Sequence, residues 1–422
     1  MTKKALLILG GSNDQLFMIH TAHEMNLETV VVDGNKNAKG LKQATYSKTI
    51  DFSNTDAVIK YAEELIAKGV NICGVLTMGS DVPHIIAKIT KHFSWIGPSI
   101  ETAKITTDKF LMKNILKNSG IAVPCYALVE SSEDILAYWD KWGSQSIIIK
   151  PIDAAGSRGV SILSSSADID QLYKHAKKNS KSGKVIIEEY IEGPQISTES
   201  VIYDGQYFHP GFADRVYNET KNFYPYIMEN GGWQPSQLEE TKHHEICNQI
   251  ENIAKAIKLE RGIIKGDIVY SIKYKKPMVI EIASRLSGGD FSASLVPLAY
   301  GINYVKTAIQ IAINTHIDFS ELEPKHKYIV ANRYFFVPQG VLNSIEGLEK
   351  LQKYTNIKKI EFNYKLNSTI PKIENHGQRV GVFVISDINY AKVQETIDIV
   401  YKTIHFVVDN KSYSGHPQYY KL

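Results

Sequence analysis

Strand and helix signals alternate along the first hundred residues, and this order constrains the fold more than any other feature of the chain. The predicted strands are 5–9, 29–33 and 73–77, and the predicted helices are 15–25, 56–68 and 83–92. Strands separated by single helices favour a parallel, doubly wound α/β sheet. A Gly10-Gly11 turn follows the first strand without the full dinucleotide-binding glycine pattern, so we interpret it as an ordinary turn or as a wall of a substrate pocket.

The length of 422 residues is too great for one ordinary core, so we expect two to four domains or lobes. Gly97-Pro98 marks a boundary after the first sheet, which places an N-terminal Rossmann-like domain at 1–106. A middle region at 107–324 combines strands and helices, and 325–422 is predicted to form a small α+β lobe. The predicted fold class is therefore α/β for the first domain and α+β for the remainder.

Several elements of the middle region bear on a possible site. The predicted strands are 121–129, 146–150, 184–193, 196–203 and 206–213, followed by a strand pair at 266–272 and 277–282. A helix is predicted at 132–142 with Ser132 as its N-cap. Residues 218–237 lack a clear period, and a loop of this length is unusual unless it has a function.

Composition and charge exclude several classes of protein. A formal charge of +3 is too small for this length to favour nucleic acid or a membrane surface as a partner. The 3 cysteines, Cys73, Cys125 and Cys247, are far apart, which indicates reduced thiols and offers no zinc-binding spacing. The first apolar run is too short for a signal sequence or a membrane span. We therefore expect a cytoplasmic protein.

A glycine-containing loop follows the predicted strand at 146–150. It runs Ile147-Ile-Ile-Lys-Pro-Ile-Asp-Ala-Ala-Gly-Ser-Arg-Gly-Val160. Glycine lets a backbone turn through φ > 0 and approach a ligand closely. The N–H groups of such a loop, together with Ser157 and Arg158, can hold phosphate oxygens, and Lys150 would supply positive charge beside them. A loop of this kind is more often an ordinary turn, so phosphate binding here is a hypothesis.

Two carboxylates lie on the predicted strand pair at 266–272 and 277–282. Asp267 and Glu281 are joined by a short turn, so an antiparallel pairing would bring their side chains to the same face. Two such acids repel unless a cation lies between them, and Mg²⁺ favours carboxylate and phosphate oxygens. The alternative is two unrelated acids that face solvent. Because Glu281 lies in an apolar run, where an acid is costly without a partner, we favour the metal site.

Further polar residues surround these motifs. Arg285 follows the second acid and could bind a phosphoryl group or a carboxylate through its planar fork, although a surface arginine in a turn is equally compatible. The strand end Glu188-Glu-Tyr-Ile191 could border an adenine, although it is ordinary by itself. Candidate substrate residues on or beside the loop at 218–237 are His209, Arg215, Tyr217 and Trp233. Scattered loop aromatics explain each of these four equally well.

The order of these pieces resembles the ATP-grasp superfamily. Lys109 at the start of a helix precedes Lys150 and its glycine loop, and Glu188-Glu-Tyr-Ile191, the paired acids and a trailing arginine follow. The resemblance extends from the N-terminal sheet to the C-terminal lobe. The segment Glu281-Ile-Ala-Ser-Arg285, followed by Gly288-Gly-Asp290, is most similar to the branch of bacterial L-amino-acid ligases and related carboxylate–amine ligases.

The resemblance implies an ATP-grasp fold of two α+β lobes at 107–324, with a mobile lid at about 120–187, and roles for particular residues. The residues implied to bind ATP are Lys109, Lys150, Gly156, Ser157, Arg158, Gly159, Glu188, Glu189, Tyr190, Ile191 and Gln195. Gln195 stands where many members have a ribose-binding glutamate. Asp267 and Glu281 are implied to hold Mg²⁺, and Arg285 with Lys150 is implied to be catalytic. Gly288 and Gly289 are further candidates for the substrate pocket.

The implied activity is an ATP-dependent carboxylate–amine ligase that acts through an acyl-phosphate and releases ADP and phosphate. Its expected partners are a small-molecule carboxylate, taken to be an amino acid, and an amine, with no nucleic acid and no membrane. Dimers are common in the resembled family, which makes a homodimer a further expectation. The alternatives are a carboxylase or formyl-transferring enzyme that uses bicarbonate or formate, and a nucleotide-binding module without turnover.

Overall fold

The computed structural model describes residues 3–143 and 145–420, and its N-terminal part forms a parallel sheet. The strands are β1 (Lys4–Leu9), β2 (Glu28–Asp33), β3 (Tyr46–Thr49) and β4 (Asn71–Leu76), in the order β3-β2-β1-β4. The helices are α1 (Asn13–Glu24), α2 (Lys39–Gln43), α3 (Thr55–Ala67), α4 (Pro83–Phe93) and α5 (Ile100–Ile105). Every pair of neighbouring strands is parallel, which confirms the predicted α/β sheet. Residues 5–9 of β1 are fully buried, as expected for a central parallel strand.

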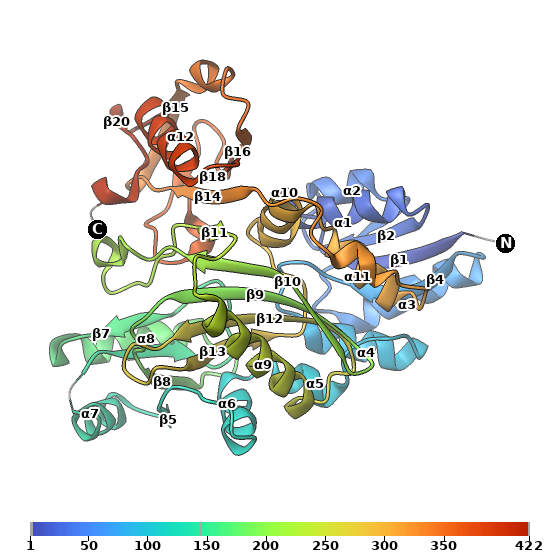
Figure 1. Cartoon of the computed structure of the whole chain (residues 1–422), viewed down its shortest axis with the longest axis horizontal. Helices are drawn as coiled ribbons and strands as arrows, with labels where there is room; N and C mark the ends of the chain where they lie inside the picture. The colour runs from blue at the N-terminus through green and yellow to red at the C-terminus, as the bar shows by residue number, and fades with distance from the viewer. Residues whose placement is uncertain (1–2, 144, 421–422) are drawn as a thin grey trace.

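An antiparallel sheet of eight strands forms the centre of the described chain (Figure 1). Its order is β13-β12-β9-β10-β11-β14-β18-β16. The strands are β9 (Gln195–Tyr203), β10 (Gln206–Arg215), β11 (Gly232–Gln234), β12 (Arg261–Tyr270), β13 (Pro277–Ala283), β14 (Ile329–Phe335), β16 (Ile357–Phe362) and β18 (Gly381–Asp387). Helix α9 (Glu240–Ala256) packs Ile246, Ile250 and Ile253 into the hydrophobic cluster that covers one face of this sheet. Part of the opposite face packs against the N-terminal sheet and α11 (Tyr304–Ala312), and other residues of the sheet, among them Arg215 and Asp267, line a cleft.

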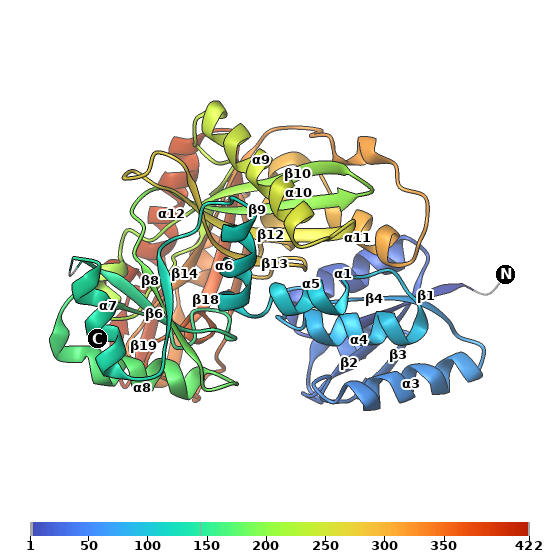
Figure 2. The same cartoon turned by 90° about the horizontal axis from the view of Figure 1, so that it is seen from below.

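A second antiparallel sheet forms the lid lobe, and it lies beside the central sheet in both views (Figures 1 and 2). Its strands are β5 (Tyr126–Val129), β6 (Ile147–Pro151), β7 (Ser161–Leu163) and β8 (Val185–Glu189), in the order β5-β8-β6-β7. Its helices are α7 (Ser132–Lys141) and α8 (Ile169–Asn179), and α6 (Lys109–Asn118) leads into it. The ATP-grasp arrangement of antiparallel lobes implied by the resemblance is therefore present.

Two boundaries in the lid lobe differ from the sequence prediction. The N-cap of α7 is Ser131 rather than Ser132, because Ser131 forms a capping box with Asp134. Strand β5 begins at Tyr126 rather than at 121, after Pro124, which has no N–H to donate to a strand ladder. Both differences are local and leave the lid topology unchanged.

The C-terminal region divides its strands between two sheets. A small sheet has the order β17-β15-β19-β20, with β15 (Gly340–Glu346), β17 (Thr369–Ile370), β19 (His405–Val408) and β20 (Lys411–Tyr413). Strands β14, β16 and β18 instead extend the central sheet, because β11 pairs with β14. Strand β11 lies within the predicted loop at 218–237 and is too short for a period to reveal it. The predicted small α+β lobe thus shares a sheet with the middle region.

The remaining helical segments connect these sheets. The α-helices are α10 (Val296–Tyr300), α11 (Tyr304–Ala312) and α12 (Tyr390–Thr403), and a π-helical turn spans Phe291–Leu295. Short 3-10 turns occur at Ser166–Asp168, Thr220–Phe223, Phe319–Leu322, Leu348–Leu351, His376–Gln378 and Pro417–Tyr419. Across residues 3–143 and 145–420, the structure contains no helix that is long and apolar enough to span a bilayer.

Candidate active site

A cleft of about 690 Å³ lies where the N-terminal domain, the lid lobe, the central sheet and the C-terminal region meet. Most of the residues singled out in the sequence line it. Those residues are Lys109, Lys150, Gly156, Ser157, Arg158, Glu188, Glu189, Tyr190, Ile191, Gln195, Arg215, Tyr217, Asp267, Glu281, Arg285, Gly288 and Gly289. Parts of the chain that are far apart in sequence therefore converge on one site.

Two lysines reach the cleft from different elements, Lys109 from α6 and Lys150 from β6. Lys109 follows Asp108, whose carboxylate caps helix α6 by accepting from the N–H groups of Phe110 and Leu111. The Lys109 ammonium lies 2.9 Å from Glu281 Oε1 and donates to the carbonyl of Ala154 at 2.7 Å. Burial opposes its charge, but neighbouring carboxylates, chiefly Glu281, outweigh burial and raise the pKa of Lys109. The side chain is thus held as a cation.

Lys150 is held by the carboxylate of Glu188, a residue that was predicted to border an adenine. Its Nζ lies 2.8 Å from Glu188 Oε1, and Lys113 Nζ lies 3.2 Å from the same oxygen. All three side chains are buried. Burial disfavours the charge of Glu188, but the two ammonium groups outweigh it and lower the pKa of this carboxyl. The Glu188 side chain is therefore engaged in orienting Lys150.

Lys113 is a site residue that sequence reasoning missed. It lies one turn after Lys109 on α6 and is fully buried. Burial lowers its pKa to about 8, and its Nζ lies 3.2 Å from the carbonyl of Ile280. The sequence signal that could have identified Lys113 is its spacing of four residues from Lys109. Residues at that spacing lie on the same side of a helix.

The strand end Glu188-Glu-Tyr-Ile191 lines the cleft, although its side chains have different environments. The Glu189 carboxylate lies 2.7 Å from Lys273 Nζ and accepts from the Tyr274 hydroxyl at 2.9 Å. Ile191 packs in a small apolar cluster with Val269 and Met278. An apolar side chain at this position can cover a flat ring, which suits the base of a nucleotide.

The glycine loop adopts the backbone conformation that its sequence predicts. Gly156, Ser157 and Gly159 all have positive φ, at +64°, +60° and +71°. Gly159 does not line the cleft: a Cβ there would stand 2.7 Å from the Cβ of Asn179, so this glycine permits close packing inside the lid. Ser157 holds positive φ without being glycine, which costs free energy unless other contacts stabilise it.

The two predicted metal ligands stand opposite each other. Asp267 on β12 pairs with Glu281 on β13, as the short turn between the strands predicts. Arg215 Nη1 donates to Asp267 Oδ1 at 2.8 Å, and Lys265 also contacts this carboxylate. Burial raises the pKa of Asp267, but Arg215 and Lys265 outweigh it, and the net pKa lies well below the usual range. Both carboxylates are thus paired with cations in the cleft.

These residues fit a magnesium ion that arrives with nucleotide phosphates. Mg²⁺ commonly takes one or two carboxylates and completes its octahedron with phosphate oxygens and water. Among the residues that the structure describes, no cluster of three His, Cys, Asp or Glu side chains offers a full protein cage for a metal. Asp267 and Glu281 therefore match the partial ligand set that a nucleotide-bound ion requires, with Lys109, Lys265 and Arg215 now neutralising the two acids.

Arg285 connects the cleft to the N-terminal domain. Its Nε lies 2.7 Å from Asp81 Oδ1, and its Nη1 donates to the carbonyl of Leu286 at 3.0 Å. Burial opposes the charge of Arg285, but Asp81 outweighs it and raises the pKa of the guanidinium. Asp81 lines the cleft and was missed, because 204 residues separate it from its partner.

Gly288 and Gly289 lie where the cleft meets the N-terminal domain, a contact that we call the seam. A Cβ at Gly288 would stand 2.8 Å from Gly79 Cα and 2.7 Å from Asp14 Oδ2, so the seam requires glycine. The carbonyl of Gly289 accepts from the Tyr334 hydroxyl at 3.3 Å. Asp14, Gly79 and Tyr334 all line the cleft, and the sequence carries no local signal for them.

A charged cluster lies at the end of the cleft near the C-terminal region. Arg215 contacts Glu229 as well as Asp267. Burial raises the pKa of Glu229, but Arg215 and other nearby cationic groups lower it to about 2. The Arg379 guanidinium stacks 3.4 Å from the Tyr334 ring centroid, and its Nη1 donates to the carbonyl of Glu229. Glu229 and Arg379 were missed because this cluster joins segments about 150 residues apart.

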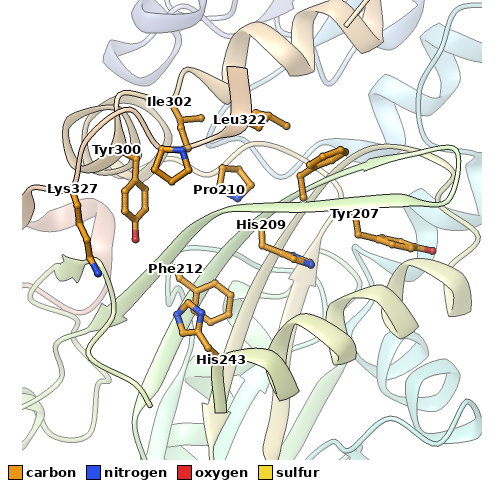
Figure 3. A pocket seen from close by; sticks show the side chains of 11 residues that line it. Tyr207, His209, Pro210, Phe212, His243, Tyr300, Ile302, Leu322 and Lys327 are labelled. Atoms are coloured by element: carbon orange, nitrogen blue, oxygen red, sulfur yellow. The ribbon is translucent and has the colours of Figure 1, made fainter. Parts of the chain in front are cut away.

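His209, which was predicted as a substrate residue, lies outside the cleft that gathers most of the other candidates. It lines a second pocket of about 540 Å³, beside Phe212 and His243 (Figure 3). Regular alternation would place His209 on the same face as Arg215. A β-bulge between Phe208 and Gly211 inserts one residue and turns His209 toward the face covered by α9, where its Nδ1 contacts Ser200 Oγ at 2.8 Å.

Trp233 is also placed away from the cleft. It lies on β11, with the Arg333 guanidinium 4.8 Å from its ring centroid and the Tyr390 ring at 5.5 Å. These contacts place the indole against the C-terminal hydrophobic cluster. The neighbouring residue Gly232 lines the cleft, because successive residues of a strand point to opposite faces.

Comparisons with known proteins agree with this architecture. The profile of the ATP-grasp domain matches residues 106–289, and that of the L-amino acid ligase C-terminal domain 2 matches residues 333–409. The L-arginine-specific L-amino acid ligase of Bacillus subtilis is 23% identical over 333 residues, which cover 76% of this chain and 77% of the relative.

Two solved structures show the same fold. The L-amino acid ligase of Bacillus licheniformis superposes with a TM-score of 0.82 at 17% identity, over 97% of this chain and 100% of that one. Biotin carboxylase from Campylobacter jejuni superposes with a TM-score of 0.73 at 18% identity, over 98% and 94%. The chain belongs to the ATP-grasp superfamily and is similar to its L-amino acid ligases.

Proposed function

We propose that this chain is an ATP-dependent ligase that joins the carboxylate of an amino acid to an amine through an acyl-phosphate. The observation that carries the proposal is the convergence on one cleft of the paired acids Asp267 and Glu281, the cations Lys109 and Lys150, and the loop at 156–159. These are the groups that a nucleoside triphosphate and its metal require. The similarity to L-amino acid ligases supports the class of substrate.

The first step transfers the γ-phosphoryl group to the substrate. A carboxylate oxygen attacks the γ-phosphorus, and a new O–P bond forms as the bond to the β-phosphate oxygen breaks and ADP leaves. Phosphoryl transfer needs positioning and charge neutralisation rather than a covalent protein group. Lys109 and Lys150 would hold the phosphates, with Glu188 and Lys113 fixing the direction of Lys150. A magnesium ion held by Asp267 and Glu281 would add further neutralisation when bound.

The second step forms the amide. The amine nitrogen attacks the acyl carbon, the C–N bond forms, the bond from that carbon to the phosphate oxygen breaks, and the nitrogen loses its proton to solvent. Arg285, fixed by Asp81, would stabilise the charge on the departing phosphate, and Arg215, which also lines the cleft, would bind a substrate carboxylate. Because an acyl-phosphate hydrolyses in water, the loop at 156–159 must cover it during this step.

The test is product analysis with the purified chain, ATP and Mg²⁺ against pairs of L-amino acids and simple amines. We expect ADP and phosphate in equal amounts and a condensed product whose mass equals the two substrates less water. AMP and pyrophosphate would contradict the acyl-phosphate step. A carboxylated product that depends on bicarbonate would support a carboxylase instead, and ATP binding without ADP formation with any acceptor would indicate a binding module.

A further inference from the structure

The short segment 374–379 of the C-terminal region reaches across the cleft to the glycine loop of the lid. The backbone N–H of His376 donates to the carbonyl of Gly156 at 3.1 Å. The His376 Nε2 lies 3.1 Å from Ser157 Oγ. These contacts join residues 219 positions apart in the chain and attach the loop to the C-terminal region. The proposed reaction assigns no role to this histidine.

The hydrogen bonds determine which form of His376 makes the contact. The backbone N–H of Glu229 also points to His376 Nε2, at 3.4 Å, so this nitrogen is an acceptor. The Ser157 hydroxyl must therefore be the donor in its own contact. Burial, with Arg379 nearby, lowers the pKa of His376 to about 3, which keeps the imidazole neutral and able to accept.

Hydrogen bonds within residues 374–379 fix the conformation of this segment independently of the lid. Asn375 and Gln378 form a capping box that fixes the turn, and Gln378 Oε1 accepts from the N–H of Glu374 at 2.7 Å. Arg379 Nε donates to the carbonyl of His376 at 2.9 Å. Such a preorganised turn loses little conformational entropy when the lid closes on it.

The contact also offsets a local strain in the lid. Ser157 has φ of +60°, a conformation that is unfavourable for a residue with a side chain. Hydrogen bonds that the segment makes with Gly156 and Ser157 stabilise this conformation, and opening the lid would remove that support. An open position of the loop would therefore lack contacts that residues 374–379 supply.

We propose that residues 374–379 form a latch for the lid, in which His376 is a positioning residue that holds Gly156 and Ser157 over the acyl-phosphate until the amine has reacted. This inference rests on the proposed function, because an exposed acyl-phosphate is lost to water. The latch also connects to the substrate end of the cleft. Glu229, which donates to His376 Nε2, pairs through its carboxylate with Arg215.

The kinetic test compares His376→Ala, His376→Gln and Ser157→Ala with the wild-type chain. We expect His376→Ala and Ser157→Ala each to raise the ratio of ADP released to amide formed by about fivefold, the factor that one hydrogen bond represents. The amide oxygen of His376→Gln can accept the same bonds and should restore a ratio near that of the wild type. His244→Ala, which removes a 74% exposed histidine from α9, is the matched control.

A double-mutant cycle separates a direct contact from a general loss of stability. If His376 and Ser157 act through each other, the double variant should have the same ADP-to-amide ratio as either single variant. Additive effects, or a wild-type ratio in both single variants, would overturn the latch. Ser157→Ala removes one hydroxyl from a loop, so this arm remains informative even if His376→Ala folds poorly.

A second measurement does not depend on ligase activity. Hydrogen exchange of the peptide covering 154–160 should slow when the wild-type chain binds ADP with Mg²⁺ and should slow much less in His376→Ala. Equal protection in both proteins would refute the latch. If calorimetry detects no ADP binding to the wild-type chain, the proposed function fails instead, and the two failures are thereby distinguished.

Discussion

Glu281 stands directly opposite Asp267 across the β12–β13 hairpin, and the two carboxylates are held by separate sets of cations. Lys109 pairs with Glu281, and both Arg215 and Lys265 pair with Asp267. This arrangement gives each of two neighbouring acids its own cationic partner. Under the proposed function, we expect these cations to pair with the phosphates instead when a nucleotide brings its own divalent ion.

The first prediction concerns Glu281. Glu281→Gln keeps the shape of the side chain but removes its charge, so we expect the rate of ADP formation to fall about 100-fold, the scale for losing one electrostatic group from an active site. The fold should be retained, because the Glu281 side chain is 29% exposed and at the cleft surface. ADP release and the thermal unfolding midpoint measure the two effects. Wild-type turnover in this variant would mean that the acid has a structural role.

The second prediction concerns the pH dependence of stability at Lys113. Its pKa is about 8 in the folded chain, below the ordinary value of 10.5, because it is buried. The unfolded chain then binds this proton more tightly, so the contribution of Lys113 to the free energy of unfolding rises as the pH increases from 8 toward 10.5.

Urea denaturation at pH 7.5 and pH 9.5 tests this sign. The difference in free energy of unfolding between the wild-type chain and Lys113→Met should shift in favour of the wild type at the higher pH, on the order of 1 kcal/mol or more. Lys117→Met, at an exposed position on the same helix, should show no such shift. A shift of the opposite sign would mean that Lys113 is charged more readily in the folded chain.

The third prediction concerns the seam at Gly288. Gly288→Ala places a Cβ against the backbone of Gly79, which cannot move like a flexible side chain, so the N-terminal domain must shift away from the cleft. We expect a loss of about 1–3 kcal/mol in the free energy of unfolding, the usual cost of overpacking, together with a higher KM for the carboxylate substrate. In the control Gly34→Ala, the new Cβ meets its nearest atom at an ordinary 3.5 Å. Equal stability of both variants would contradict the tight seam.

The fourth prediction compares Arg215 with His209, two residues of β10 that a regular strand would place on one face. Arg215→Lys keeps a positive charge but loses the planar fork that contacts both Asp267 and Glu229, so kcat/KM for the amino acid should fall about 10-fold or more. His209→Asn should leave kcat/KM within about twofold, because the bulge directs His209 into the second pocket. A large loss in His209→Asn would show that this pocket serves the reaction.

Local patterns predicted those parts of the site that are close in sequence. The turn between β12 and β13 made the opposition of Asp267 and Glu281 foreseeable, because a short antiparallel connection fixes which residues face each other. The turns at Gly156 and Gly159 were foreseeable because glycine adopts positive φ readily, whereas the positive φ of Ser157 was not. The side of β10 on which His209 lies was not foreseeable, because one inserted residue reverses the alternation of a strand and the bulge becomes visible only when the partner strand is known.

The sequence by itself determined the order of strands and helices, the loop beside Lys150 and the paired acids, because each depends on periodicity or on a turn of a few residues. Tertiary structure alone decided that Lys113 shares Glu188 with Lys150, that Asp81 fixes Arg285, and that His376 meets Ser157. Those pairs join segments that are distant from one another in the sequence. Their geometry follows from how separate hydrophobic cores pack together, a property of the whole chain that no short window of residues contains.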